Sequence, residues 1–327
     1  MIDFRYHLVS IVAIFLALAL GIVLGSTVLY APLVKFTEDT AARLRANNAK
    51  LQAENALALT RGAAGDAFVA ARMPQLVEGS LAGESVVLVE TPGADSRQGE
   101  ALLEAVTAAG ATLSGRVALT DRFLATDQAP ALEQLALTAK PPTLVFPVDS
   151  TPYQKAAAVL ASAVVTNDRA VAGKENTVSA GVLESFEDGG LVTLDGEPAK
   201  PATLAIVLAP AAPLEGQDAE AQTAALVSLA TGLDAAAEGS VVAGAVPTST
   251  AAGMIAAVRS SGEASAAVST VDNIDMAFGR VVVVYALREQ VAGDAGQYGL
   301  GSDATAAEPE PVPAATPSPT PDGGVGG

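Results

Sequence analysis

The sequence contains no cysteine and no tryptophan, and it has one histidine, His7. Without cysteine, disulfides, zinc–thiolate sites and thiol chemistry are excluded. Because His7 stands beside an apolar stretch at the start of the chain, a Ser-His-Asp triad or a histidine-based zinc site in the main domain is excluded as well. Aromatic residues make up only 4%, so the core has to be built from valine, leucine, isoleucine and alanine.

Positive charge is also scarce. Lysine and arginine number 18 against 36 aspartates and glutamates, which gives a formal net charge of −18. Nucleic acid is therefore not an expected partner, because binding it needs a basic surface. Soft-metal ligands are few, since Cu(I) prefers thiolate and thioether sulfur. The four methionines do not form a motif; they are Met1, Met73, Met254 and Met276.

The first long apolar run covers Leu8–Leu29, 22 residues without a charge. As a helix it would measure about 33 Å, enough to cross a hydrocarbon core of about 30 Å. A cleaved signal peptide is the alternative, but its apolar region is usually shorter, and a cut after Ala31 would leave Pro32 beside it. We therefore expect an uncleaved membrane anchor over residues 8–31, after a short segment over residues 1–7.

Small residues within the anchor suggest association between helices. Gly21 and Gly25 form a G-x-x-x-G pair, which lets two helices approach closely in lipid. The alternative is that glycine is simply frequent in membrane helices.

The following segment, residues 32–79, is expected to be a helical, coiled-coil-like stalk. A heptad frame places Leu44 and Leu51 at d positions and Asn48 and Asn55 at a positions. Asparagine at a fixes register and favours two parallel strands. The apolar seam is thin, but anchoring in one membrane raises the effective concentration. We predict a parallel homodimer; a solvated helix that packs on its own domain is the alternative.

Residues 80–292 read as an α/β domain. Apolar runs that predict strands alternate with helical spacing, which indicates a Rossmann-like, mostly parallel sheet with helices on both faces. Strands are expected over 85–91, 113–119, 143–148, 203–209, 240–246 and 279–287, helices over 95–109, 132–139, 153–165, 218–233 and 250–260, and an irregular or hairpin insertion over 181–194. From residue 293 to 327 the composition is rich in proline and glycine, which predicts a disordered tail.

A ligand crevice is conceivable where strands of such a sheet end. Thr91 and Asp95 follow the first strand, and Asp149 and Ser150 follow the strand predicted over 143–148. Helix capping is the alternative use of these side chains. No catalytic set and no phosphate-binding glycine pattern is visible, so we expect neither an enzyme nor a bound cofactor.

Two further carboxylates, Asp272 and Asp275, stand in the stretch STVDNID. Oxygen ligands of this kind can contribute to a site for a hard cation. A solvated turn that feeds the last strand is the interpretation we favour here.

Two segments give a family resemblance. The opening MIDFRYHLVSIVAIFLALALGIVLGS, followed by LQAEN in the stalk, and the later STVDNIDMAFGRVVVVYALREQVAGDAGQYGLG resemble the actinobacterial MctB/SteB family. One family name implies copper efflux and a channel-like role at the outer membrane. The other implies a membrane-anchored partner of the cytoplasmic-side protein SteA, which acts in cell separation by controlling a peptidoglycan hydrolase. Both roles place the large domain outside the cytoplasm.

The charges beside the anchor predict the opposite topology. Arg5 stands alone on the N-terminal side, whereas Lys35, Arg43, Arg45 and Lys50 lie on the other side. The positive-inside rule would keep the large domain in the cytoplasm. We follow the resemblance and expect an extracytoplasmic domain.

The residues favour a tethered interaction protein over a pore. An outer-membrane channel would need a closed barrel of many alternating strands, whereas this chain has one apolar helix and an α/β pattern. We therefore predict a single-pass membrane protein of the cell envelope that regulates cell separation with a SteA-like partner and a peptidoglycan hydrolase. The alternative is copper transport, with copper implied by the resemblance alone. Expected partners are membrane lipid and a second copy of the chain.

Overall fold

A computed structural model of the chain describes residues 4–245 and 253–311, with residues 27–38 described by their backbone only. The chain divides into two units, residues 1–65 and residues 66–327. The division falls inside the first helix, α1, which runs over Phe4–Val77.

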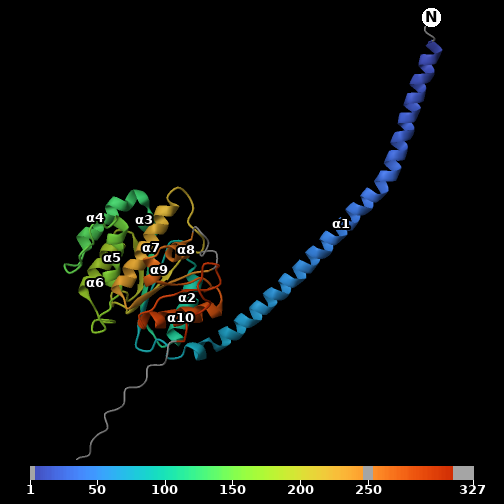
Figure 1. Ribbon diagram of the computed structural model, residues 1–327. Coiled ribbons are helices and arrows are strands. Elements are labelled where there is room, and N and C mark those ends of the chain that lie inside the picture. Colours follow the sequence, from blue (N-terminus) through green and yellow to red (C-terminus); the bar gives the residue numbers. More distant parts are fainter. Residues whose placement is uncertain (1–3, 246–252, 312–327) are drawn as a thin grey trace, which may run out of the picture. The chain divides into compact units, whose positions relative to one another are not determined.

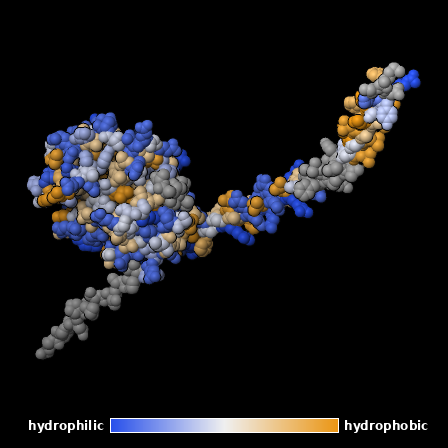
Figure 2. Space-filling model, turned by 45° about the horizontal axis from the view of Figure 1, so that its top comes forward, coloured by the Kyte–Doolittle hydropathy of each residue, from blue (hydrophilic) through white to orange (hydrophobic). Residues whose placement is uncertain are grey.

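The N-terminal part of α1 is apolar on all sides. Phe4–Ser26 has a mean hydropathy of 2.9 and is long enough to cross a membrane, and none of it is buried by the rest of the protein. Figure 2 shows apolar side chains gathered at this end of the helix. Beyond the span, the side chains of residues 39–65 are almost all exposed. The predicted apolar helix and the helix after it are therefore confirmed as one continuous element.

The second unit is built on a mixed, mostly parallel sheet (Figure 1). In the described residues the order is β3-β2-β1-β4-β5-β6-β7, with β3 antiparallel to β2 and the other neighbours parallel. The strands are β1 Ser85–Glu90, β2 Thr112–Leu119, β3 Val192–Gly196, β4 Leu204–Leu208, β5 Gly239–Ala243, β6 Ser269–Val271 and β7 Gln297–Tyr298. The predicted fold class is confirmed.

Helices cover both faces of the sheet and create two cores. Alternate side chains of β1 enter different cores: Val87 and Val89 pack with the α4–α7 side, and Val86 and Leu88 pack with α2, α10 and the last turns of α1. The helices are α2 Ser96–Ala108, α3 Asp121–Leu124, α4 Ala129–Ala139, α5 Pro152–Val164, α6 Thr177–Asp188, α7 Ala219–Ala236, α8 Met254–Ser260, α9 Ala264–Ala267 and α10 Ala277–Val291, with a 3-10 turn η1 at Thr126–Gln128.

The strand predicted over 143–148 is wrong. This segment is a loop in which Val145 and Val148 are 82% and 90% exposed. Leu144 and Phe146 pack against the first core, which accounts for the apolar alternation. Pro147 lacks the N–H that a sheet ladder requires.

The insertion predicted over 181–194 is a regular helix and strand, α6 and β3. Asn176 begins α6, because its side-chain oxygen accepts hydrogen bonds from the N–H groups of Val178 and Ser179. The EDGG stretch ends the helix, with Gly189 as its C-cap, and Gly190 takes a φ of 66°.

The strand predicted over 279–287 is also wrong, because this segment lies inside helix α10. Val281, Val282, Val283 and Val284 are all buried. A helix that is buried all round carries apolar residues at every position, so the valine run resembled a buried strand. The segment before it, predicted as a turn, contains strand β6.

The sheet extends past residue 292, where the sequence predicted disorder. Gln297–Tyr298 forms β7 beside β6, and Tyr298 makes a further bridge to Ala306. The disorder prediction is therefore wrong for residues 293–311. Residues 312–327 and parts of two predicted elements, 246 and 250–252, lie outside the described residues.

The last turns of α1 belong to the α/β domain. Val77 is fully buried, and Val69 and Met73 pack against the second core. Asp66 Oδ1 accepts hydrogen bonds from the N–H groups of Ala277 at 2.6 Å and Phe278 at 3.4 Å. The carboxylate thus caps the N-terminus of α10, where free N–H groups favour a negative charge.

Candidate functional site

The first half of the predicted crevice is occupied by contacts within the chain. The backbone N–H and the hydroxyl of Thr91 both donate to the carbonyl of Leu208, at 3.1 and 2.7 Å. Asp95 caps α2 by accepting a hydrogen bond from Arg97 N–H at 3.0 Å. Thr91 therefore joins the carboxyl ends of β1 and β4, and Asp95 caps the start of α2.

The second half does not follow a strand. Asp149 has a φ of 65°, and the hydroxyl of Ser150 donates to the carbonyl of Pro147 at 2.8 Å. The next residue, Thr151, caps α5 in a capping box with Gln154. Because 143–148 is a loop, the sheet does not bring this pair to the end of β1. Ligand binding by the four residues stays a prediction.

Asp272 lies at the end of β6 and is fully buried, so the solvated turn predicted there is wrong. Its carboxylate accepts hydrogen bonds from Leu300 N–H at 2.7 Å, Gly301 N–H at 3.0 Å and Arg259 at 2.8 Å. Arg259 is itself only 4% exposed in its side chain. A buried charge is costly unless it is paired and hydrogen-bonded, and here both conditions are met. Asp275 is exposed.

Arg259 extends this network to the C-terminal segment. It donates to Thr270 Oγ1 at 2.8 Å, to the carbonyl of Tyr298 at 2.7 Å and to Asp303 at 2.7 Å. Gly299 has to be glycine, because its φ is 132° and a Cβ there would lie 2.0 Å from Asp272 Oδ1. The network therefore fixes residues 297–303 onto β6 and α8.

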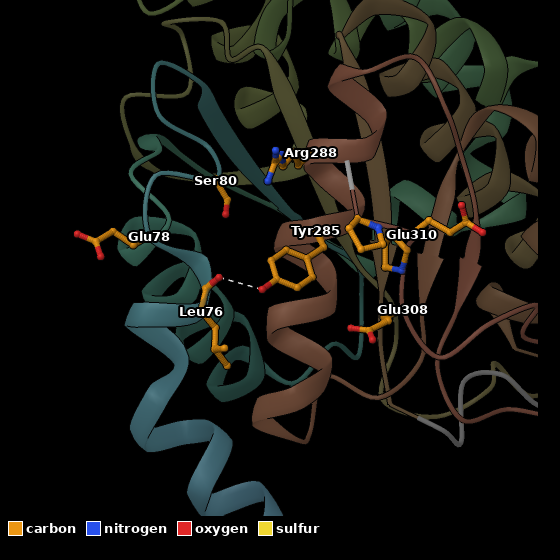
Figure 3. Close-up of a pocket in the computed structure, with 9 residues that line it drawn as sticks. Leu76, Glu78, Ser80, Tyr285, Arg288, Glu308 and Glu310 are labelled. Carbon is orange, nitrogen blue, oxygen red and sulfur yellow. Dashed lines mark hydrogen bonds between the residues drawn. The ribbon is translucent and has the colours of Figure 1, made fainter. Parts of the chain in front are cut away.

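A pocket of about 370 Å³ lies between the last turn of α1, helix α10 and residues 308–311 (Figure 3). Tyr285 reaches from α10 toward the end of α1, and its hydroxyl donates to the carbonyl of Leu76 at 2.8 Å. Burial, and then the charge of Glu308, raise the pKa of Tyr285. The phenol is therefore a neutral donor at physiological pH.

The pocket is mainly acidic. Its lining includes Glu78, Glu308 and Glu310, with Arg288 as the basic residue. A rim of this kind suits a polar or cationic group rather than an anion. Among the described residues that line the pocket, the one serine, Ser80, has no side-chain hydrogen bond to a base of the kind that a nucleophile would require.

Metal ligands do not converge. Among residues 4–245 and 253–311, no group of three or more His, Asp or Glu side chains is placed to hold a metal ion. Met73 packs in the second core and Met254 in the first, on opposite faces of the sheet. Met276 precedes α10. Met73 and Met254 therefore do not share a copper site.

The predicted oligomerisation residues are accessible. A Cβ added to Gly21 or Gly25 would meet no atom within 4 Å. Leu44 and Leu51 are each 64% exposed. The asparagines between and after them, Asn48 and Asn55, are exposed too. Pairing through these residues stays a prediction.

Sequence reasoning missed Asp66, Arg259 and Tyr285, which make polar contacts between distant segments of the chain. Asp66 stands in a helical run that reads as stalk, and its two backbone partners lie more than 200 positions away. The QYGLG stretch, residues 297–301, could have indicated the contact with Arg259 and Asp272. Closely spaced glycines mark a place where the backbone approaches another group.

Comparison with known proteins places these features in a family. The model of the family "Copper transport outer membrane protein, MctB" matches residues 1–309. Proteins named copper transporter MctB from Mycobacterium tuberculosis and Mycobacterium bovis are 28% identical over 313 residues, covering 93% of this chain and 98% of theirs. The Mycobacterium leprae protein of the same name is 28% identical over 314 residues. These relatives are named as transporters rather than enzymes. Since the match runs from the apolar helix through the whole α/β domain, the chain belongs to the MctB family.

Proposed function

We propose that this chain is a single-pass, membrane-tethered protein of the cell envelope that serves copper export by binding other envelope proteins. One observation carries the proposal: an exposed apolar span, Phe4–Ser26, belongs to the same helix whose last turns enter the α/β domain. The membrane segment and the folded domain are thus joined by a continuous helix. The names of the relatives supply the link to copper.

The chain is better suited to assist a copper pathway than to be the conduit. In the described residues one helix is long and apolar enough to span a membrane. The sheet is covered by helices on both faces rather than surrounding a channel. The sequence offers no cysteine and one histidine, although Cu(I) favours sulfur and then imidazole.

We further propose that the tethered chain is a parallel homodimer. An isolated helix with exposed leucines and few stabilising pairs is marginal in water, and residues 39–65 show one intrahelical ion pair among the described residues, Lys50–Glu54. A second copy supplies the missing partner for Leu44 and Leu51. Both copies enter the membrane at their N-termini, so the helices run in the same direction.

Cysteine crosslinking tests the dimer without interference, because the natural chain has no thiol. Leu44→Cys and Leu51→Cys should each form an interchain disulfide in membranes under mild oxidation, since d positions face each other in a parallel pair. Ala46→Cys and Ala53→Cys, on the outer face of the same heptads, serve as controls. Equal crosslinking at inner and outer positions would reject the pairing.

Cell separation with a SteA-like membrane partner and a peptidoglycan hydrolase is the second candidate. The observation that favours it is the same long exposed helix, which suits signalling between a membrane partner and a domain beyond it.

An extracytoplasmic domain is part of both proposals. A single cysteine at exposed Thr193 would report it, because a membrane-impermeant maleimide labels the thiol in intact cells only if the domain lies outside.

Deletion of the gene separates the two candidates. Loss of copper export predicts growth arrest at a copper concentration that the parent strain tolerates, with normal cell separation. Loss of a cell-separation factor predicts chained, lysozyme-sensitive cells with unchanged copper tolerance. Unchanged copper tolerance would reject the first proposal, and normal separation and lysozyme resistance would reject the second.

A further inference from the structure

One edge of the sheet is covered on a single face. Arg116 and Ala118 of β2 lie opposite Asp195 and Thr193 of β3 in the antiparallel ladder. The intervening side chains, such as Val117, pack into the first core. Since successive residues of a strand point to opposite faces, these four side chains point to the side of the sheet that carries α2 and α10.

No described helix lies over that part of the second face. Asp195 and Thr193 are exposed and Leu113 of β2 is 38% exposed, whereas Val117 and Leu119 on the first face are 0% and 5% exposed. α2 packs beside the strand pair β1–β2. A sheet with helices on both faces therefore lacks one covering element next to α2.

A groove of about 560 Å³ occupies this position, between α2 and β2. Its apolar lining comes from Leu103 and Ala108 of α2 and from Leu113 of β2. The helix and the strand each supply apolar side chains to the groove, and grooves lined in this way can accept the apolar face of an amphipathic helix.

Glu104 lines the groove, and Asp195 lies opposite Arg116, which also lines it, in the β2–β3 ladder. Glu104 and Asp195 are exposed, and neither has an ion pair among the described residues. The one cation of the lining, Arg116, is occupied by Glu90 at 3.4 Å and Glu100 at 3.6 Å. The potential at the rim is therefore negative and complements a basic partner.

We propose that this groove binds an amphipathic helix of a partner protein, with its apolar stripe on Leu103 and Leu113 and its lysines or arginines facing Glu104 and Asp195. The proposal rests on the proposed function as a tethered interaction protein and specifies the chemistry of the partner. A second copy of this chain, with net charge −18, matches the rim poorly. So does the C-terminal segment 312–327, which has no lysine or arginine and one aspartate, Asp322.

Site-specific photocrosslinking in cells tests the proposal with the full chain. A photoreactive residue at Thr107, an exposed position that lines the groove, should form an adduct, and mass spectrometry should map it to a helix with apolar spacing and net positive charge. The same residue at Thr138, exposed on α4 on the other face, is the control. An adduct of equal yield at Thr138, an acidic partner segment, a second copy of the chain, or no adduct at Thr107 would overturn the proposal.

Charge reversal at the groove distinguishes specific binding of the partner from nonspecific electrostatic attraction to the acidic chain. The double variant Glu104→Lys, Asp195→Lys should lower the Thr107 adduct by ~10-fold, because two exposed attractions become repulsions. The matched variant Glu184→Lys, Glu187→Lys changes overall charge equally on α6 and should leave the adduct unchanged. An equal loss in both variants would overturn the proposal. The Leu51→Cys disulfide, measured in every variant, shows separately whether the tethered dimer is intact.

Discussion

The α/β domain should require the last turns of α1 for its stability. A fragment over residues 66–311 keeps these turns, and a fragment over 80–311 begins where the sequence alone placed the domain boundary. The longer fragment retains the Asp66 cap of α10, the buried Val77 and the hydrogen bond from Tyr285 to Leu76. We predict a large stability difference between the two.

The size of the difference follows from the contacts that are lost. Complete burial of Val77 stabilises the fold by about 1.5–3 kcal/mol. The Asp66 cap and the Tyr285 hydrogen bond are worth about 1 kcal/mol each. Partial burial of Val69 and Met73 adds about 1–2 kcal/mol. The shorter fragment should therefore lose about 5 kcal/mol, a large part of the 5–15 kcal/mol that typical domains have in total.

Urea unfolding followed by circular dichroism measures this difference. The 66–311 fragment should unfold in one cooperative transition, and the 80–311 fragment should unfold at much lower urea or be unfolded in buffer. Asp66→Ala in the longer fragment should reproduce about 1 kcal/mol of the loss. If the two fragments differ by less than 1 kcal/mol, the last turns of α1 are not part of the folded domain.

Three further predictions follow from the C-terminal network and the anchor. Asp272→Asn leaves Arg259 without its buried counter-ion and should lower the free energy of unfolding of the 66–311 fragment by about 3–5 kcal/mol. Asp275→Asn, at an exposed position, should change this free energy by less than 0.5 kcal/mol. Equal effects of the two variants would contradict the network. Burial and the hydrogen bond to Glu289 raise the pKa of Tyr298. The contribution of this phenol to stability should therefore be constant below about pH 10 and be lost above it. Tyr298→Phe should weaken the alkaline fall of stability in urea titrations, and an unchanged slope would contradict the assignment. Gly25→Leu fills an open position of the N-terminal apolar helix and should lower the Leu44→Cys crosslinking yield, while Leu24→Ala should not. An unchanged yield would show that the helices do not pair through this face.

The sequence was sufficient for the fold class because the central buried strands β1, β4 and β5 each carry their own signal. Leu204–Leu208 is a short run of aliphatic residues, and a helical pattern over 218–233 follows it directly. Such units can be recognised one at a time, and their alternation implies a parallel sheet.

The local sequence pattern predicted a strand where α10 lies, because the valines of this segment belong to a buried helix. β-branched residues are typical of strands, but here all four of Val281–Val284 lie in the interior, and long-range packing decides the conformation. The cap from Asp66 is part of that packing, and no pattern near residue 277 announces it.

The contacts at the candidate sites join segments that are far apart in the sequence, so the spacing of residues along the chain does not reveal them. Asp272 read as a surface carboxylate, yet Arg259 and the turn at Leu300–Gly301 bury it. By contrast, Asp95 was weighed as a helix cap, and it caps α2. Capping is a local event, whereas the ion pair requires β6, α8 and the C-terminal segment to be in place.

The central claim, that a tethered domain serves copper export, is tested most directly by complementation of the deletion strain. Two chains are compared at equal expression: the full chain, and residues 66–327 exported by a cleavable signal peptide and released from the membrane. We predict that copper tolerance returns with the full chain alone. Full tolerance with the released domain, or no copper phenotype in the deletion strain, would contradict the account.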